Sequence, residues 1–313
     1  MGGPDTFLIQ LRGQGEYFAT HGIDGHVLIT STEPISDVRN VQIELKGFGN
    51  IFPDRKKIGE ATKYHYYEEY IKYKYIIHEG ELSAGNSAFP FSFVLPANIP
   101  SSFEGEHGYV RYLLEAKIDR SGIFSTNKLQ SLPVRVNSIV DLNAVPGANI
   151  PQTKSKSKKF GCLCWSGCCG GPVSATVRIP HYGYVVGGVI PISAEIENLS
   201  TNTMSCTKAR LHQKVVYKAG PASRSIITAS RSTTTKISEV GQGRIAAGAS
   251  DSWNAVPLPI PQVVPSNLGG CNINVIHVTY TLEFRVVTSC IGRDLKLKLP
   301  IWIGTIPLAP DNP

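Results

Sequence analysis

The chain has 313 residues and a net charge of +7, a length that suits two domains of ordinary size. It contains no run of about 18 apolar residues, and its N-terminal FLIQL run is short, ends at Arg12 and lacks a basic stretch before it, which argues against a membrane span or a signal peptide. Seven cysteines, four of them between residues 162 and 169, do not form the framework of a secreted disulfide protein. We therefore expect a cytosolic protein.

The charge is spread unevenly along the chain. Residues 1–150 contain 14 Lys/Arg and 17 Asp/Glu, residues 151–160 contain four Lys, and residues 161–313 contain 13 Lys/Arg and 7 Asp/Glu. The middle and the second half are therefore the basic parts. Such a surface suits acidic lipid headgroups or phosphorylated segments, and suits nucleic acid less well.

The first half begins as a series of strands. The segments FLIQL, HVLIT and VRNVQIELKG between residues 7 and 47 are separated by turns rich in glycine or proline. A tyrosine-rich run, TKYHYYEEYIKYKYIIHEG, follows at 62–80. Its rings could stack the bases of single-stranded nucleic acid, but Glu68 and Glu69 would repel phosphates. Packing between strands is the favoured interpretation, and we expect no nucleic-acid partner.

Residues 89–120 contain two strands joined by a proline-bounded turn, and the second strand alternates apolar and charged side chains from Val110 to Asp119. The pattern returns near the C-terminus, where Tyr280 and Glu283 follow Tyr112 and Glu115 at a spacing of 168 residues. LPVRVNSIV at 132–140 likewise matches LPIWIGTIP at 299–307. These matches predict an all-β chain made by tandem duplication of one domain.

Composition changes sharply between residues 141 and 172, first to Pro, Gly and Asn, then to Lys and Ser, then to Cys and Gly. Such a stretch is typical of a connection between domains. We expect domains over 1–142 and 173–313, with a Lys/Cys-rich linker over 143–172 that ends in the first strand of the second domain.

Two features suggest attachment to a membrane. The start MGGPDT fits the myristoylation pattern at Gly2, and the lysines of the linker precede a cysteine group that suits palmitoylation. One acyl chain with about four basic residues, each contributing roughly 1 kcal/mol near an anionic leaflet, holds a protein there. The alternatives are a frayed terminus, an exposed linker with reduced thiols, and a zinc site whose ligand spacing fits poorly. The candidate basic residues are Lys154, Lys156, Lys158 and Lys159, and the candidate acylated residues are Gly2, Cys162, Cys164, Cys168 and Cys169.

A basic stripe is predicted in the second domain. Its members recur at even spacing on one face of an expected strand, while Ala209, Leu211, Val215 and Tyr217 occupy the other face. The stripe could bind an acidic or phosphorylated segment laid beside it, and the alternative is a solvated sheet face. The stripe consists of Lys208, Arg210, His212, Lys214 and Lys218.

Motifs for catalysis are absent from the sequence. There is no G-x-S-x-G, no H-E-x-x-H and no P-loop, and the eight histidines are scattered singly. We expect no enzymatic activity, no cofactor and no metal.

Several segments, taken in order, resemble the α-arrestins, the arrestin domain-containing proteins that include the thioredoxin-interacting branch. They are GQGEYFATHGIDGHVLIT with VQIELKGFG, FPFSFVLPANIPSSFEGEHGYVRYLLEAKIDR, VDLN followed by lysines and cysteines, HYGYVVGGVIPISAEIEN, and GASDSWNAVPLPIP through LPIWIGTIPL. The resemblance covers nearly the whole chain. It implies two immunoglobulin-like β-sandwiches, an N-terminal and a C-terminal arrestin domain.

The resemblance also implies a non-enzymatic adaptor that binds cytosolic parts of membrane receptors or transporters and directs their endocytosis, sorting or ubiquitination. It implies residence in the cytoplasm with recruitment to the plasma membrane or endosomes. The alternative is a lipid-anchored sorting scaffold, similar to a retromer subunit, that acts without a ubiquitin ligase.

Two departures from the family pattern matter. Family members usually carry PPxY motifs that HECT-type ubiquitin ligases bind, whereas this sequence has no Pro-Pro pair. The chain is either a member without such a tail or one whose tail is missing from this sequence. Ser250 also stands where the thioredoxin-interacting branch has a cysteine, which excludes a mixed disulfide at that position.

Overall fold

The computed structural model describes residues 3–13, 15–52, 64–65, 67–121, 127–159, 171–221, 229–269, 275–288 and 294–310. Strands dominate these residues, and none of the helical segments described is long and apolar enough to cross a membrane. The first half contains β1 (Thr6–Leu11), β2 (Glu16–Phe18), β3 (Gly22–Ser31), β4 (Val38–Ile51), β5 (Tyr64–His65), β6 (Tyr67–Glu79), β7 (Gly85–Val94), β8 (Phe103–Gly105), β9 (Gly108–Arg120) and β10 (Lys128–Asn137).

A short 3-10 helix, η2 (Leu142–Ala144), precedes the strands of the second half. These are β11 (Gln152–Lys158), β12 (Val173–Ile179), β13 (Gly183–Val185), β14 (Val189–Asn198), β15 (Met204–Pro221), β16 (Ala229–Gln242), β17 (Ser250–Pro259), β18 (Ile276–Thr288) and β19 (Leu295–Gly304), with η3 (Ser266–Gly269) before β18. β11 lies inside the stretch 143–172.

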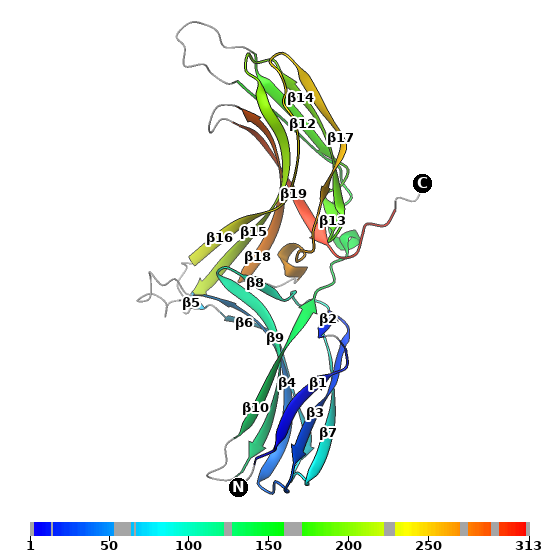
Figure 1. Cartoon of the computed structure of the whole chain (residues 1–313), viewed down its shortest axis with the longest axis vertical. Helices are drawn as coiled ribbons and strands as arrows, with labels where there is room; N and C mark the ends of the chain where they lie inside the picture. The colour runs from blue at the N-terminus through cyan, green and yellow to red at the C-terminus, as the bar shows by residue number, and fades with distance from the viewer. Residues whose placement is uncertain are drawn as a thin grey trace. The chain divides into compact units, whose positions relative to one another are not determined.

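The chain forms two compact units. The first contains Met1–Ile139 with Tyr217–Arg231 and Asn267–His277, and the second contains Val140–Val216 with Ser232–Ser266 and Val278–Pro313. In the first unit, one sheet has the order β1-β3-β7 and the other has the order β2-β10-β9-β4-β6, with β8 added to β9 (Figure 1). Apolar side chains from both sheets, such as Ile29 and Leu114, are buried between them.

The second unit repeats this arrangement with one additional strand in its smaller sheet. Its smaller sheet has the order β11-β12-β14-β17, and its larger sheet follows β13-β19-β18-β15-β16. β3 and β14 cover equivalent positions, 22–31 and 189–198, and β10 and β19 cover 128–137 and 295–304. The predicted all-β fold, a tandem repeat of one sandwich, is confirmed.

Two buried tyrosines close equivalent corners of the two sandwiches. Tyr112 on β9 donates its hydroxyl hydrogen to the carbonyl of Pro100, and Tyr280 on β18 donates to the carbonyl of Val264, both at 2.6 Å. Burial raises the pKa of both phenols, so each remains a donor. The tyrosine match seen in the sequence therefore reflects one repeated hydrogen bond between a strand and the turn before it.

Candidate functional site

The predicted basic stripe lies on the outward face of β15. Ala209, Leu211 and Val215 alternate with it and are buried in the sandwich core. Lys208, Arg210 and His212 are half-buried, whereas Lys214 and Lys218 are exposed. The alternation of faces deduced from the sequence is thus the one that the structure shows.

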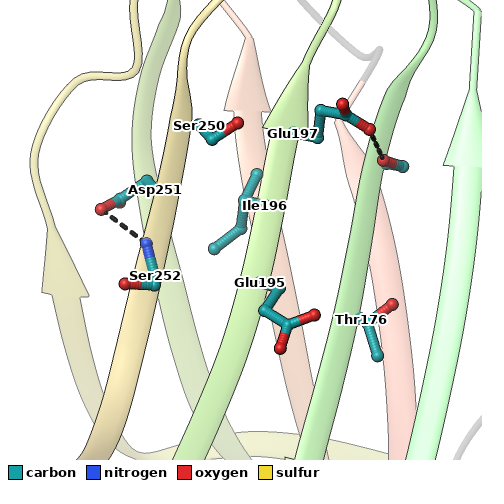
Figure 2. Close-up of a pocket in the computed structure, with 8 residues that line it drawn as sticks. Thr176, Glu195, Ile196, Glu197, Ser250, Asp251 and Ser252 are labelled. Atoms are coloured by element: carbon teal, nitrogen blue, oxygen red, sulfur yellow. Dashed lines mark hydrogen bonds between the residues drawn. The ribbon is translucent and has the colours of Figure 1, made fainter.

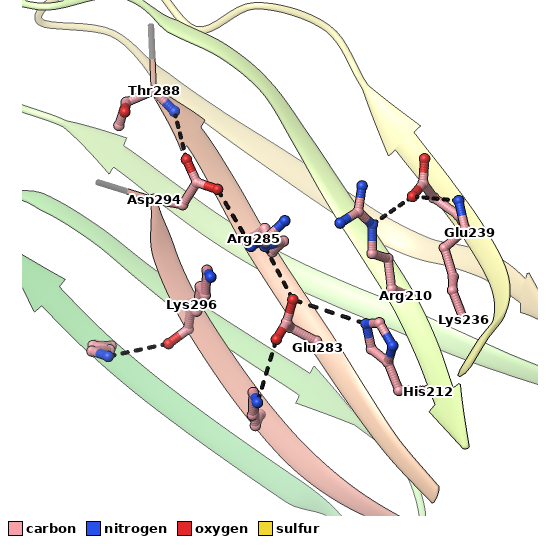
Figure 3. A network of polar contacts seen from close by, with 11 residues as sticks. Arg210, His212, Lys236, Glu239, Glu283, Arg285, Thr288, Asp294 and Lys296 are labelled. Carbon is pink, nitrogen blue, oxygen red and sulfur yellow. Dashed lines mark hydrogen bonds and ion pairs between the residues drawn. The ribbon is translucent and has the colours of Figure 1, made fainter. Parts of the chain in front are cut away.

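One carboxylate on the neighbouring strand serves three cations of this face. Glu239 of β16 accepts from Arg210 Nε at 2.5 Å and from Lys236 Nζ at 3.2 Å (Figure 3). Lys208 Nζ lies 3.7 Å from Glu239 Oε1. The hydrogen bond from Arg210 is the main cause that lowers the pKa of Glu239. Glu239 therefore stays ionised and holds half of the stripe in place.

A second carboxylate, Glu283 of β18, lies beside the middle of the stripe and is only 8% exposed. Arg285 Nε, Lys298 Nζ and His212 Nε2 lie 3.0, 3.5 and 3.9 Å from its oxygens (Figure 3). Burial lowers the pKa of His212; Glu283 opposes this effect, and the charges of Arg210, Lys298 and Arg285 add to it. His212 is therefore neutral at pH 7 and is not one of the stripe's cations.

The face as a whole keeps an excess of positive charge. Asp294 is its third carboxylate and lies 3.6 Å from Arg285 Nη2. Neither Lys214 nor Lys218 forms an ion pair with another described side chain. Among the described residues, three carboxylates stand against eight cations, Lys208, Arg210, Lys214, Lys218, Lys236, Arg285, Lys296 and Lys298. An anionic partner is the ligand that this face fits.

Three of the four lysines predicted to lie near a membrane form hydrogen bonds within the second unit. Lys154, Lys156 and Lys158 belong to β11, and each ammonium group donates to a main-chain carbonyl at the edge of β19. The acceptors are Lys298 at 2.9 Å, Lys296 at 3.3 Å and Asp294 at 3.4 Å. Gln152 continues the series with a 3.2 Å bond to the Pro300 carbonyl. These side chains cover a strand edge; Lys159 lies just beyond β11 and is exposed.

A shallow hollow lies on the outward face of the sheet β11-β12-β14-β17 (Figure 2). Its lining is mainly carboxylates and hydroxyls, from Ser174, Thr176, Glu195, Glu197 and Ser250–Ser252. Arg178 pairs with Glu195 at 2.7 Å, and Ser174 donates to Glu197 at 3.4 Å. No histidine or cysteine is among the described residues that line the hollow.

The remaining sequence candidates fall outside the described residues. These are Gly2 and the cysteines 162, 164, 168 and 169. Within the described residues, no group of three or more His, Cys, Asp or Glu side chains is placed to hold a metal ion.

Comparison with known protein families identifies both sandwiches. The model of the arrestin (or S-antigen) N-terminal domain matches residues 7–143, and that of the C-terminal domain matches residues 169–308. The chain belongs to the arrestin family. The resemblance inferred from sequence segments is confirmed.

The relatives of this arrestin chain are arrestin domain-containing proteins. Arrestin domain-containing protein 4 of Homo sapiens is 32% identical over 308 residues, which cover 94% of this chain and 69% of the relative. Arrestin domain-containing protein 17 of Caenorhabditis elegans is 31% identical over 307 residues, covering 93% and 68%. Arrestin domain-containing protein 1 of Mus musculus is 34% identical over 237 residues, covering 74% and 50%.

The two arrestin domains differ at one sheet edge. β11 pairs along β12, whereas β1, the counterpart of β12, pairs with β3 alone among the described residues. The amide of Arg12 donates to the Asp24 carbonyl at 2.8 Å, so the even-numbered residues of β1 bond to β3. Phe7, Ile9 and Leu11 therefore direct their amide and carbonyl groups toward the open edge.

The open edge leaves an apolar seam incompletely buried. Phe7, Ile9 and Leu11 are half-buried, as is Leu132 on β10 across the seam. The corresponding side chains of the C-terminal arrestin domain, Ala175, Val177, Ile179 and Leu299, are at most 2% exposed. Among the described residues, no strand of the first domain supplies the cover that β11 gives to the second.

Sequence reasoning did not find this edge. The alternating Lys-Ser pattern of Lys154–Lys158 has the period of a strand and could have indicated β11. The Lys/Ser composition, however, is typical of a linker. Unless β11 is recognised as a strand, the sequence does not show that the edge of β12 is covered while that of β1 is open.

Proposed function

We propose that this chain is a non-enzymatic adaptor that binds cytosolic parts of membrane receptors or transporters through its N-terminal arrestin domain. Its membership of the arrestin family supports an adaptor role, and the absence of catalytic motifs from the sequence agrees with it. The adaptor works from the cytoplasm and is recruited to the plasma membrane or endosomes. It directs its cargo to endocytosis, sorting or ubiquitination, with a HECT-type ligase recruited by a route other than a PPxY motif in these 313 residues.

The open edge of β1 is the observation that carries the proposal. The amide and carbonyl groups of Phe7, Ile9 and Leu11, which bond to no other described strand, can bond to one added strand, as β12 bonds to β11. An extended cytosolic segment would also cover the half-buried seam. Its inward side chains should be apolar, because Leu132 and the inward side chains of β1 line that seam.

Substitution of Ile9 tests this mode of binding. Ile9→Pro removes an amide that points away from β3, so β1 keeps its bonds to β3 while the edge loses a donor. Loss of one main-chain hydrogen bond, about 1 kcal/mol, should reduce recovery of cargo roughly fivefold in quantitative affinity purification. Ile9→Val keeps the amide and should recover cargo like the parent. Equal recovery by both variants, with thermal unfolding unchanged, would contradict strand addition.

The cationic face of the C-terminal arrestin domain supports a second role, contact with an acidic cargo segment or an anionic membrane. Eight described cations facing three described carboxylates favour either partner. Lys208→Glu with Lys214→Glu should lower binding to vesicles that contain phosphatidylserine, measured by co-sedimentation. Thr279→Glu with Thr281→Glu on β18 is the control. It tests whether negative charge added elsewhere on the face lowers vesicle binding as much as the lysine reversals do. Binding that survives the lysine reversals would remove this role.

Recruitment by acyl chains at Gly2 or at the linker cysteines would instead make the chain a lipid-anchored sorting scaffold. Metabolic labelling with a myristate analogue that is lost in Gly2→Ala would favour the scaffold. Labelling absent from the parent chain would leave the adaptor without that anchor.

A further inference from the structure

A ridge of four aromatic rings, two of them exposed and two half-buried, crosses the outward face of the larger sheet in the first unit. The ring of Tyr67 stacks on that of Phe48 with centroids 5.5 Å apart, Phe48 lies 6.1 Å from Tyr109, and Tyr109 lies 5.7 Å from Phe52. Tyr67 is 51% exposed and Phe52 44%. Aromatic rings that contact one another on an open sheet face, instead of in the core, are suited to contact a partner.

Away from its Tyr67 end, the ridge already holds a guanidinium group, at Tyr109. The Arg111 guanidinium carbon lies 3.8 Å from the centroid of the Tyr109 ring, and its Nε and Nη2 donate to the two oxygens of Glu104 at 2.6 and 3.0 Å. Glu104 stands directly opposite Tyr109 in the pairing of β8 with β9. A ring and a carboxylate side by side therefore form a binding site for an arginine side chain, which stacks on the ring and bonds to both carboxylate oxygens.

The Tyr67 end of the ridge repeats the same pair without a cation. Tyr67 and Glu69 are two residues apart on β6, so they share a face, and Glu69 stands opposite Phe48. The Tyr67 hydroxyl lies 3.4 Å from Glu69 Oε2. Lys46, on the same face of β4, is bound by Glu115 and lies 3.3 Å from Glu44. No described cation forms an ion pair with Glu69.

We propose that Tyr67, Phe48 and Glu69 form a binding site for an arginine side chain of an extended protein segment. The guanidinium stacks on the Tyr67 and Phe48 rings and bonds to the Glu69 carboxylate, as Arg111 does with Tyr109 and Glu104. A carboxylate that no described cation pairs with, beside the exposed ring of Tyr67, fits a basic partner by charge. The site lies on a different sheet from β1 and does not depend on strand addition.

The planar group and the stack predict a preference for arginine over lysine, because an ammonium group bonds to a carboxylate as a point charge and does not stack. The probe is the acetylated and amidated pentapeptide Gly-Gly-Arg-Gly-Gly, with its lysine counterpart as comparison. Titration of the whole chain, followed by the NMR resonances of the Tyr and Phe rings, should shift Tyr67 and Phe48 with the arginine peptide. The lysine peptide should bind at least about threefold more weakly than the arginine peptide.

Glu69→Gln removes the charge and should weaken binding of the arginine peptide about fivefold, and Tyr67→Leu should weaken it to a similar extent. Glu79→Gln, at the far end of β6, removes the same charge from the same strand and should leave binding unchanged. Glu69 is exposed, so its substitution leaves the fold intact. Equal binding of the two peptides, unchanged binding in Glu69→Gln, or no shift at millimolar peptide would each overturn the proposal.

Discussion

At the scale of single residues, His212 shows how a charged surface determines the protonation of one of its members. It lies among Arg210, Arg285 and Lys298, and burial is the first cause of its lowered pKa. A histidine in the unfolded chain takes up a proton near pH 6.5, whereas the folded chain resists that proton. The folded state therefore binds fewer protons below that pH.

This difference predicts a pH dependence of stability. The contribution of neutral His212 is complete above about pH 6.5 and is lost as the pH falls from there toward the lowered pKa of the folded state. His212→Gln keeps a polar side chain and cannot titrate, so its free energy of unfolding should fall less than that of the parent between pH 7.5 and 5.5. Urea unfolding at both pH values measures this, and parallel behaviour of the two proteins would contradict it.

For single residues, the sequence predicts which face of a strand a side chain occupies, but not which distant residue it contacts. The face of Arg210 followed from the alternation with Ala209 and Leu211, which a strand requires. Its partner, Glu239, is 29 residues away and became its neighbour only through the pairing of β15 with β16. Such long-range pairs depend on strand register, which the local pattern does not contain.

At the scale of elements, β11 covers the edge of β19 with its side chains, whereas a neighbouring strand normally covers such an edge with backbone hydrogen bonds. Its lysines bond to the carbonyls at the edge of β19 and cover that edge. Edge strands that are left open pair with other chains, and charged side chains are a common protection. The segment with linker-like composition therefore protects the C-terminal arrestin domain.

Replacement of Lys154, Lys156 and Lys158 by serine should uncover the edge of β19. The amides of Lys296 and Lys298 should exchange faster with solvent. The free energy of unfolding should fall by only about 1 kcal/mol, because two of the three lysine hydrogen bonds are exposed and the third is partly buried. Lys72, Lys74 and Lys128 replaced by serine provide the control, since the same charge is removed from the other domain. Exchange at β19 that is equally slow in both triple variants would show that the lysines do not protect it.

At the scale of the whole molecule, the duplication made the fold readable from the sequence. Tyr112 and Tyr280 recur because each closes a corner of its sandwich with the same hydrogen bond. The difference in burial between equivalent residues of the two domains cannot be predicted from the repeat. Ile9 and Val177 look alike in sequence, and only the presence of β11 beside Val177 makes one half-buried and the other buried.

We propose that the N-terminal arrestin domain uses the edge of β1 to bind an extended segment of its cargo. The duplication supplies the matched control for a photo-crosslinking measurement in cells. A photoreactive amino acid at Leu8 on β1 reports contacts at the open edge, and the same group at Thr176 on β12 reports the equivalent edge that β11 covers.

Crosslinks from Leu8 to the cytosolic segment of a membrane receptor or transporter, absent from Thr176 and reduced by Ile9→Pro, are the predicted result. Crosslinks to such a segment from Thr176 as strong as those from Leu8, or none from Leu8 while cargo still co-purifies, would contradict the claim.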